Sequence, residues 1–196
     1  MTRPIRNVEE VKWRGSPGRR RGIGRVAGRR AMTGVTGRRI IGAIAVGLLA
    51  LGLSGCIPAP PLPPPSWRAE MLNDLNAFRA AHGVGPVAEC GVLDLAAQRH
   101  SNNMAAFNYM GSTGPDGPLS SRIAALGFNA ANLGENVAAG QTSVSQVMGN
   151  WEADPPHIAN LLAPPFTLAG FGVASTGVGP YHYYWTQDFA SPGGPC

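Results

Sequence analysis

The fold class follows from two runs near the C-terminus, Leu168-Ala-Gly-Phe-Gly-Val-Ala-Ser-Thr176 and Tyr181-His-Tyr-Tyr-Trp-Thr-Gln-Asp-Phe189. Both runs are rich in β-branched and aromatic residues, and Gly177-Val-Gly-Pro180 separates them. This pattern is typical of two strands joined by a turn and predicts a β-hairpin. The residues before it carry helical patterns. Helices followed by a hairpin predict an α+β domain, in which the helices pack on a small antiparallel sheet.

The helical patterns lie between Ser66 and Leu162. Apolar residues at spacings of three and four predict a first helix that follows Ser66 and ends at Gly83. Further helices are predicted at about 92–108, at 120–126, after a capping Ser143, and from Asp154-Pro155 to Leu162. In the second helix, the expected buried face consists of Leu93, Ala96, Ala97, His100, Met104 and Phe107.

The charge of the chain divides at its first cysteine. Residues 1–55 hold 12 of the 16 basic residues and only 2 of the 11 acidic ones, a net charge of +10. Residues 56–196 hold the other 4 basic and 9 acidic residues and carry −5. Binding to nucleic-acid phosphates needs a basic surface, so we expect no nucleic-acid partner for the C-terminal part. Its 141 residues suffice for one domain.

The N-terminal part has the features of an export signal. Residues 40–53 are uncharged and apolar and directly follow Arg38-Arg39. Fourteen residues suit the hydrophobic core of a signal peptide, because a membrane-spanning helix needs about 20. The following Leu53-Ser-Gly-Cys56 resembles the lipobox of bacterial lipoproteins, which implies a diacylated Cys56 as the new N-terminus. We therefore predict an anchor on the outer face of the cell membrane; the alternatives are an ordinary signal peptide and an uncleaved anchor.

Three regions result from this interpretation. Residues 1–55 are a leader with a lipoprotein signal peptide, and an alternative translation start at Met32 would shorten it. Residues 56–66 are a linker with six prolines, which favours an extended polyproline II spacer. Residues 67–196 are the domain. Its two cysteines, Cys90 and Cys196, most simply form a disulfide in an exported chain, and two free thiols are the alternative.

Five motifs in a fixed order carry a family likeness. They are Leu75-Asn-Ala-Phe-Arg79, His100-Ser-Asn-Asn-Met-Ala105, Gly134-Glu-Asn-Val-Ala-Ala-Gly140, Trp151 with His157-Ile-Ala-Asn-Leu-Leu162, and Tyr184-Trp-Thr-Gln-Asp-Phe189. Together they resemble the bacterial branch of the CAP superfamily (cysteine-rich secretory, antigen 5 and pathogenesis-related 1 proteins). The resemblance implies that the domain is SCP-like and folds as an α-β-α sandwich.

The resemblance also implies a surface cleft with two histidines and two acidic residues, often holding Zn²⁺. The matching positions are Glu135 and His157, but Ser112 stands where the first histidine is usual, and a serine is a poor zinc ligand. The resemblance therefore implies a possible metal ligand in His157 without its usual partner. His100 would pack under the cleft, and we interpret it as a hydrogen-bonded core residue. His182 is interpreted as a surface or sheet residue.

Two acidic candidates have structural alternatives. Asp154 has the spacing of the second acidic residue of the cleft, but it also suits the N-cap of a helix that begins with Pro155. Glu135 is a cleft candidate, or it accepts backbone N–H bonds in a glycine-flanked loop.

Two functions remain open at this point. We expect a non-catalytic module that binds a lipid, a cell-envelope component or a protein partner outside the cytoplasm. The alternative is a metal-assisted hydrolase of peptides or envelope material, in which Glu135 is the general base and His157 holds the metal. A nucleophilic arrangement of Ser112, His157 and Glu135 is a further alternative, but Ser112 lacks the pattern of a nucleophile elbow.

Overall fold

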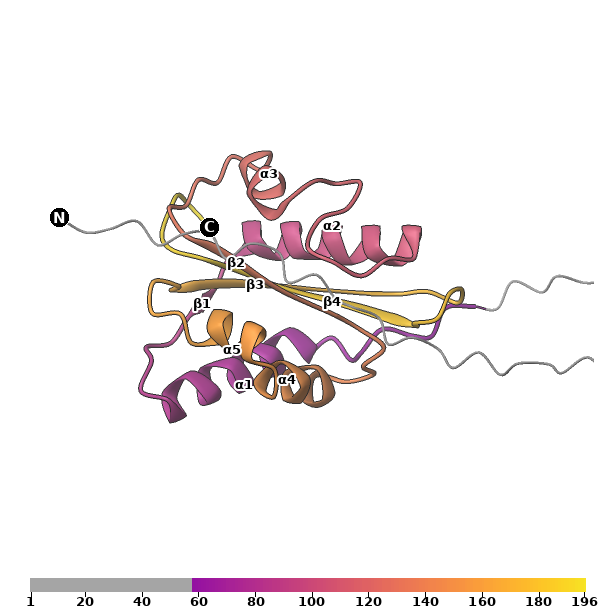
Figure 1. Cartoon of the computed structure of the whole chain (residues 1–196), viewed down its shortest axis with the longest axis horizontal. Helices are drawn as coiled ribbons and strands as arrows, with labels where there is room; N and C mark the ends of the chain where they lie inside the picture. Colours follow the sequence, from indigo (N-terminus) through magenta and orange to yellow (C-terminus); the bar gives the residue numbers. More distant parts are fainter. Residues whose placement is uncertain (1–57) are drawn as a thin grey trace, which may run out of the picture. The chain divides into compact units, whose positions relative to one another are not determined.

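The computed structural model describes residues 58–196, which fold as helices on the two faces of a four-stranded sheet (Figure 1). The leader, the lipobox and Cys56 lie outside these residues. The helices are α1 (Trp67–Ala81), α2 (Gly91–Phe107), α3 (Leu119–Ala124), α4 (Val144–Glu152) and α5 (Pro155–Leu161). The strands are β1 (Ala88–Glu89), β2 (Leu133–Ala139), β3 (Leu168–Ser175) and β4 (Tyr183–Ala190).

The sheet has the order β1-β3-β4-β2. The predicted hairpin is present as β3 and β4, which pair antiparallel, and β2 pairs antiparallel with the other edge of β4. The short β1 runs parallel to β3, so the sheet is mixed rather than purely antiparallel. The alternative that placed Glu135 in a glycine-flanked loop is wrong, because this residue lies in β2. Glycine and alanine give β2 little intrinsic strand propensity, and it is pairing with β4 that makes it a strand.

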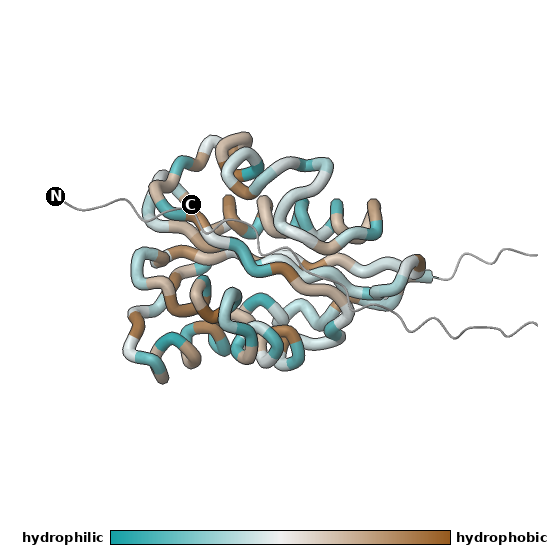
Figure 2. The backbone as a smooth tube through the Cα atoms, viewed as in Figure 1, coloured by the Kyte–Doolittle hydropathy of each residue, from teal (hydrophilic) through white to brown (hydrophobic). Residues whose placement is uncertain are grey.

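The helices form one layer on each face of the sheet. In Figure 1, α1, α4 and α5 lie on one side and α2 and α3 on the other, which confirms the predicted α-β-α sandwich. Figure 2 shows hydrophobic and hydrophilic residues alternating along α1 and α4, as expected of helices with one face on the core. The layer of α1, α4 and α5 buries most of the large aromatic side chains: Trp67, Trp151, Phe166, Phe171, Trp185 and Phe189.

The other layer depends on close contact between α2 and β3. A Cβ atom on Gly170 would lie 2.2 Å from the backbone of Leu93, and one on Gly172 would lie 2.3 Å from that of Ala97. These two glycines therefore let the helix backbone approach the strand. The predicted buried face of α2 is confirmed except at Phe107, whose side chain is 63% exposed. Phe107 is the last residue of the helix, and periodicity does not indicate where a helix runs past its partner.

The remaining helices agree with their sequence signals. In α4 the expected residues are buried, and Ser143 Oγ accepts a hydrogen bond from Gln146 N at 3.3 Å. The predicted disulfide joins Cys90 at the start of α2 to Cys196, with 5.0 Å between their Cα atoms, and so holds the C-terminal tail on the domain. Within residues 58–196, no helix has the length and apolarity needed to cross a bilayer.

Candidate functional site

Arg122 on α3 lies at the centre of a buried ionic cluster. It is the only Lys or Arg after Arg99 in the sequence. Its Nη1 donates hydrogen bonds to the carbonyl oxygens of Ser112, at 3.0 Å, and Gly117, at 2.8 Å. Its Nη2 forms an ion pair with the Glu135 carboxylate, and only 3% of the Glu135 side chain is exposed. The guanidinium therefore ties the loop before α3 to the edge strand β2.

His100 on α2 joins the same cluster from below the loop. It is fully buried, with Nδ1 at 2.8 Å from Asp116 Oδ2 and Nε2 at 2.9 Å from the carbonyl oxygen of Gly111. Both ring nitrogens therefore lie within hydrogen-bond distance of an oxygen atom of the loop before α3. Nε2 also lies 3.9 Å from Glu135 Oε2. His100 is thus hydrogen-bonded in the core, as interpreted from the sequence, and is also part of the ionic cluster.

Asp188 completes the cluster from β4, where it lies directly opposite Glu135 in the strand register. Burial raises the pKa of the Asp188 carboxyl well above its ordinary value, and the Glu135 carboxylate raises it further, while Arg122 opposes the shift. Within the described part of the chain, both Asp188 oxygens and Glu135 Oε1 are buried without a hydrogen-bond partner. A proton on Asp188, which its raised pKa favours, would supply the donor that these buried oxygens lack.

The loop before α3 is held by Tyr109. Its hydroxyl donates to Asp116 Oδ1 at 3.3 Å, and burial, followed by the charge of Asp116, raises the pKa of Tyr109 to about 12. A Cβ atom on Gly114 would overlap the Tyr109 ring, so the loop needs glycine there to close over the tyrosine. The Asp116 carboxylate therefore contacts three side chains. Besides Tyr109, it lies 2.8 Å from His100 Nδ1 and 3.8 Å from Arg122 Nε.

The other two predicted site residues lie on α5. His157 Nδ1 is 2.6 Å from Asp154 Oδ2. Asp154 occupies the N-cap position of α5, as one reading of the sequence expected, but its side chain makes no capping hydrogen bond and pairs with His157 instead. The carbonyl oxygen of His157 faces the side chain of Asn136, with Nδ2 of Asn136 at 3.4 Å.

Strand alternation separates the predicted cleft residues. Glu135 points toward α2 and α3, whereas its neighbour Asn136 points toward α5, because successive side chains of a strand face opposite sides of the sheet. The side chain of Glu135 and that of His157 therefore belong to different layers. Ser112 is exposed. Its backbone carbonyl oxygen accepts a hydrogen bond from Arg122, and it is Arg122, not Ser112, that contacts Glu135. The structure does not bring Ser112, His157 and Glu135 together as a nucleophilic triad.

The donor set does not fit the two-histidine zinc site that the resemblance implies. Zinc needs several nitrogen, sulfur or oxygen donors that converge on one point. The guanidinium of Arg122 already neutralises Glu135, and Nδ1 of His157 faces Asp154. Among residues 58–196, no three His, Cys, Asp or Glu side chains are arranged to hold a metal ion.

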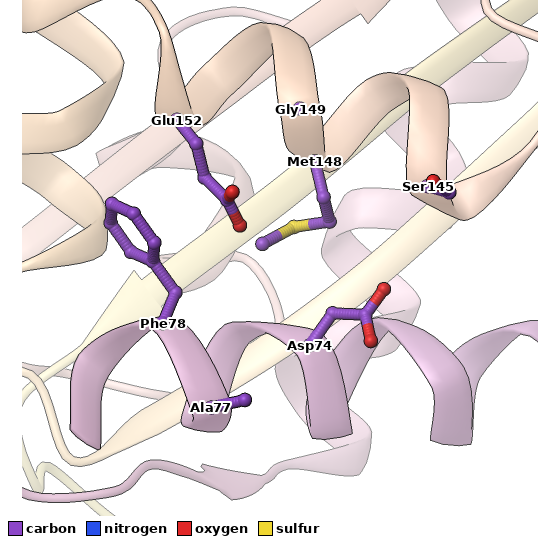
Figure 3. A pocket seen from close by; sticks show the side chains of 7 residues that line it. All are labelled: Asp74, Ala77, Phe78, Ser145, Met148, Gly149 and Glu152. Atoms are coloured by element: carbon purple, nitrogen blue, oxygen red, sulfur yellow. The ribbon is translucent and has the colours of Figure 1, made fainter. Parts of the chain in front are cut away.

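A groove of about 400 Å³ lies between α1 and α4. Figure 3 shows the carboxylates of Asp74 and Glu152 and the apolar ends of Phe78 and Met148 directed into it. Burial raises the pKa of Glu152, and the nearby Asp74 raises it further, with His82 opposing. Ala77, Ser145 and Gly149 form the rest of the lining and leave the groove open.

Sequence reasoning missed most of the ionic cluster. Arg122 could have been identified from the sequence, because a single basic residue in the last half of an acidic domain is expected to pair with one of its carboxylates. Asp188 also had one, since a carboxylate within a strand of aromatic residues is expected to be buried with a partner. Asp116 and Tyr109 become recognisable only when the loop is folded.

Comparison with known proteins identifies relatives of this fold. Residues 72–189 match the model of the CAP family, described as the cysteine-rich secretory protein family. The protein YkwD of Bacillus subtilis (strain 168) is 28% identical over 125 residues, which are 63% of this chain and 47% of YkwD.

Solved structures extend the likeness. An extracellular protein containing a SCP domain from Bacillus anthracis (strain Ames) has 25% identity and a TM-score of 0.58, over 67% of this chain and 45% of that one. An outer surface protein of Borrelia burgdorferi has 15% identity and the same TM-score, over 65% of this chain and 94% of that one, and its likeness concerns the fold alone. The chain thus spans about half the length of the two Bacillus proteins.

Proposed function

This chain belongs to the CAP, or cysteine-rich secretory protein, family, and on that premise we propose a membrane-anchored binding module that acts outside the cytoplasm. The lipobox at Cys56 supports a diacyl anchor, and the Bacillus anthracis relative is described as extracellular. The proposed ligand is a lipid or another cell-envelope component.

The observation that carries this proposal is the groove between α1 and α4. The half-buried Phe78 ring offers apolar surface to a hydrocarbon chain, because burying such surface is favourable, and Met148, 2% exposed, lies beneath it as part of the core. Asp74 and Glu152 place two carboxylates beside that surface. Both carboxylates would repel an anionic head group of a ligand, whereas a protonated amine would neutralise their charge. The groove therefore suits an apolar chain with an amine or uncharged polar head rather than a fatty acid.

The hydrolase alternative has weaker support. A general base needs a carboxylate that is within reach of water. Glu135 is almost fully buried and already paired with Arg122, and His157 belongs to the opposite layer of the sheet. Zinc binding at His157 stays a prediction. Titration of the purified protein with Zn²⁺, with His157→Ala as control, tests it: tight binding that the variant loses would revive the metal site.

Ligand binding is tested with two amphiphiles of equal chain length. We expect the purified protein to bind dodecylamine more tightly than dodecanoic acid in a calorimetric titration. Ala77→Trp fills the groove from an exposed position on α1 and should weaken amine binding at least tenfold. Ala80→Trp adds the same side chain to the same helix outside the groove lining and should leave binding unchanged. Equal binding by both variants would exclude the groove as the ligand site.

The anchor is tested separately from the ligand. In the full chain expressed in a lipoprotein-exporting bacterium, the mature N-terminus should be an acylated Cys56, read as the mass of the N-terminal peptide. Cys56→Ser should release the protein from the membrane fraction. If the wild type lacks acylation and stays soluble, the anchored module is excluded and a secreted protein remains.

A further inference from the structure

One end of the domain carries no formal charge in its sequence. The β3–β4 turn and the C-terminal end of α2 lie at this end, and residues 58–66 run along it (Figure 1). Four segments meet there: 58–66, 103–113, 137–143 and 174–184. They contain no Asp, Glu, Lys or Arg, and His182 is their single histidine. We call this surface the charge-free end.

Specific contacts hold these segments together. The hydroxyl of Tyr184 donates to Asn108 Oδ1 at 2.8 Å, which joins β4 to the end of α2. Gly179 packs so closely on Asn108 that a Cβ atom would lie 2.3 Å from Oδ1. Trp185 Nε1 donates to the carbonyl oxygen of Gln141 at 2.8 Å and brings in the loop after β2. The charge-free end is therefore a built surface rather than a set of independent loops.

Exposed apolar side chains concentrate at this end. Among residues 58–196, six large hydrophobic side chains are exposed, and only Leu95 lies outside the four segments. Val178, at 66%, and Phe107, at 63%, are the most exposed. The full set at the charge-free end is Leu62, Phe107, Met110, Val178 and Tyr181. Scattered apolar residues need no explanation, but a group confined to one uncharged end marks an interaction surface.

The linker reaches the domain at the same end. Ser175 Oγ donates to the carbonyl oxygen of Pro60 at 2.7 Å, and the hydroxyl of Tyr183 donates to that of Pro61 at 2.8 Å. Two residues of the proline-rich segment that was predicted as a spacer, Pro60 and Pro61, therefore contact the domain. Cys56 is only four residues before Pro60. A chain of four residues spans at most about 14 Å, so an acylated Cys56 would hold this end within that distance of the membrane.

We propose that the charge-free end docks on the lipid bilayer, with Phe107, Val178 and Tyr181 in the interfacial layer. This proposal rests on the proposed lipid anchor. Aromatic and aliphatic side chains partition favourably into the interface, and tyrosine suits its polar boundary. Docking here buries no formal charge, whereas other orientations would bring carboxylates of a domain with net charge −5 against anionic lipids. The anchor and the exposed side chains then act as two membrane contacts of one molecule.

The test uses a fluorescent label at the proposed contact. Once Cys56 is acylated and Cys90 is bonded to Cys196, an introduced cysteine is the only free thiol. The acylated protein carrying Val178→Cys is labelled with nitrobenzoxadiazole and reconstituted in vesicles of phosphatidylethanolamine and phosphatidylglycerol. We expect a blue shift and quenching by lipids with a spin label near the head group. The matched control, Ala125→Cys, labels an exposed residue at the end of α3 and should keep the emission of a label in water.

A second variant checks the side chains themselves. Phe107→Ser with Tyr181→Ser should abolish the blue shift and quenching at position 178, while Leu95→Ser, which also removes an exposed apolar side chain from α2, should not. A water-like label at position 178 in protein that still floats with the vesicles would overturn the docking and leave the anchor intact. Protein that neither floats nor carries acyl chains would exclude the anchor itself. Dimers formed without vesicles and lost in the Phe107→Ser/Tyr181→Ser variant would assign this end to a second copy and overturn membrane docking.

Discussion

The two faces of the β2–β4 pair bury polar side chains in opposite ways. On the face toward α2 and α3, Glu135 and Asp188 lie opposite one another and need Arg122 as counter-charge. One residue along, on the face toward α4 and α5, Asn136 and Gln187 also lie opposite one another, and their amides share a hydrogen bond of 3.2 Å. Both pairs are buried. The ionic face depends on charge balance and pH, whereas the amide face depends only on hydrogen bonds.

Removing the counter-charge should have the largest effect. Arg122→Met leaves the buried Glu135 carboxylate without a cation, and breaking a buried ion pair from one side costs about 3–5 kcal/mol. We expect that loss in the free energy of unfolding, measured with urea at pH 7. Arg99→Met, at an exposed position of α2, is the matched control and should change it by less than about 0.5 kcal/mol. Equal effects of the two variants would mean that the ionic face does not depend on its cation.

The pH dependence should belong to the ionic face. The raised pKa of Asp188 means that the folded protein keeps a proton that the unfolded chain loses above pH about 4. The unfolded state then binds fewer protons, so stability falls as pH rises, by at most about 1.4 kcal/mol per pH unit for one group. Asp188→Asn keeps the shape of the side chain and removes its titrating carboxyl group. The urea midpoint of the variant should therefore increase relative to that of the wild type as pH rises from 4. Parallel pH profiles would contradict the protonated Asp188.

The two faces should also differ in their tolerance of a methyl group. Gly172→Ala would place Cβ 2.3 Å from the backbone of Ala97 in α2, which can move only with its helix. Gly134→Ala would meet the Phe166 ring at 2.7 Å and Asn160 Oδ1 at 2.9 Å, and side chains can rotate. Overpacking costs about 1–3 kcal/mol, and we expect Gly172→Ala at the upper end of that range and Gly134→Ala at the lower. Thermal unfolding of both variants measures the order, and a larger loss for Gly134→Ala would reverse the interpretation.

The sequence predicts elements well where one residue decides a local feature. Ser143 and the period of Val144, Val147, Met148 and Trp151 specify α4, and Asp154-Pro155 specifies the start of α5. It could not predict β2, whose Gly-Glu-Asn-Val-Ala-Ala core becomes a strand through β4.

The site is harder to predict than the fold for the same reason. Whether Glu135 meets Arg122 or His157 depends on which face of β2 it occupies, and alternation assigns a face only after the strand and its register are known. The motif therefore identified a buried carboxylate correctly but could not identify its partner. Neighbouring Asn136, in the same motif, lies with α5 instead.

The smallest effect should come from the amide face, and it should not vary with pH. Nδ2 of Asn160 donates to the backbone oxygen of Glu135 and to Oδ1 of Asn136, both at 2.9 Å. Asn160→Ala removes the donor from two part-buried acceptors, which costs about 1–2 kcal/mol. Because amides do not titrate between pH 5 and 8, the loss in the free energy of unfolding should be the same at both ends of that range. A loss that grows with pH would show that Asn160 supports Glu135 electrostatically, and the two faces of the sheet would then be one coupled network rather than two independent ones.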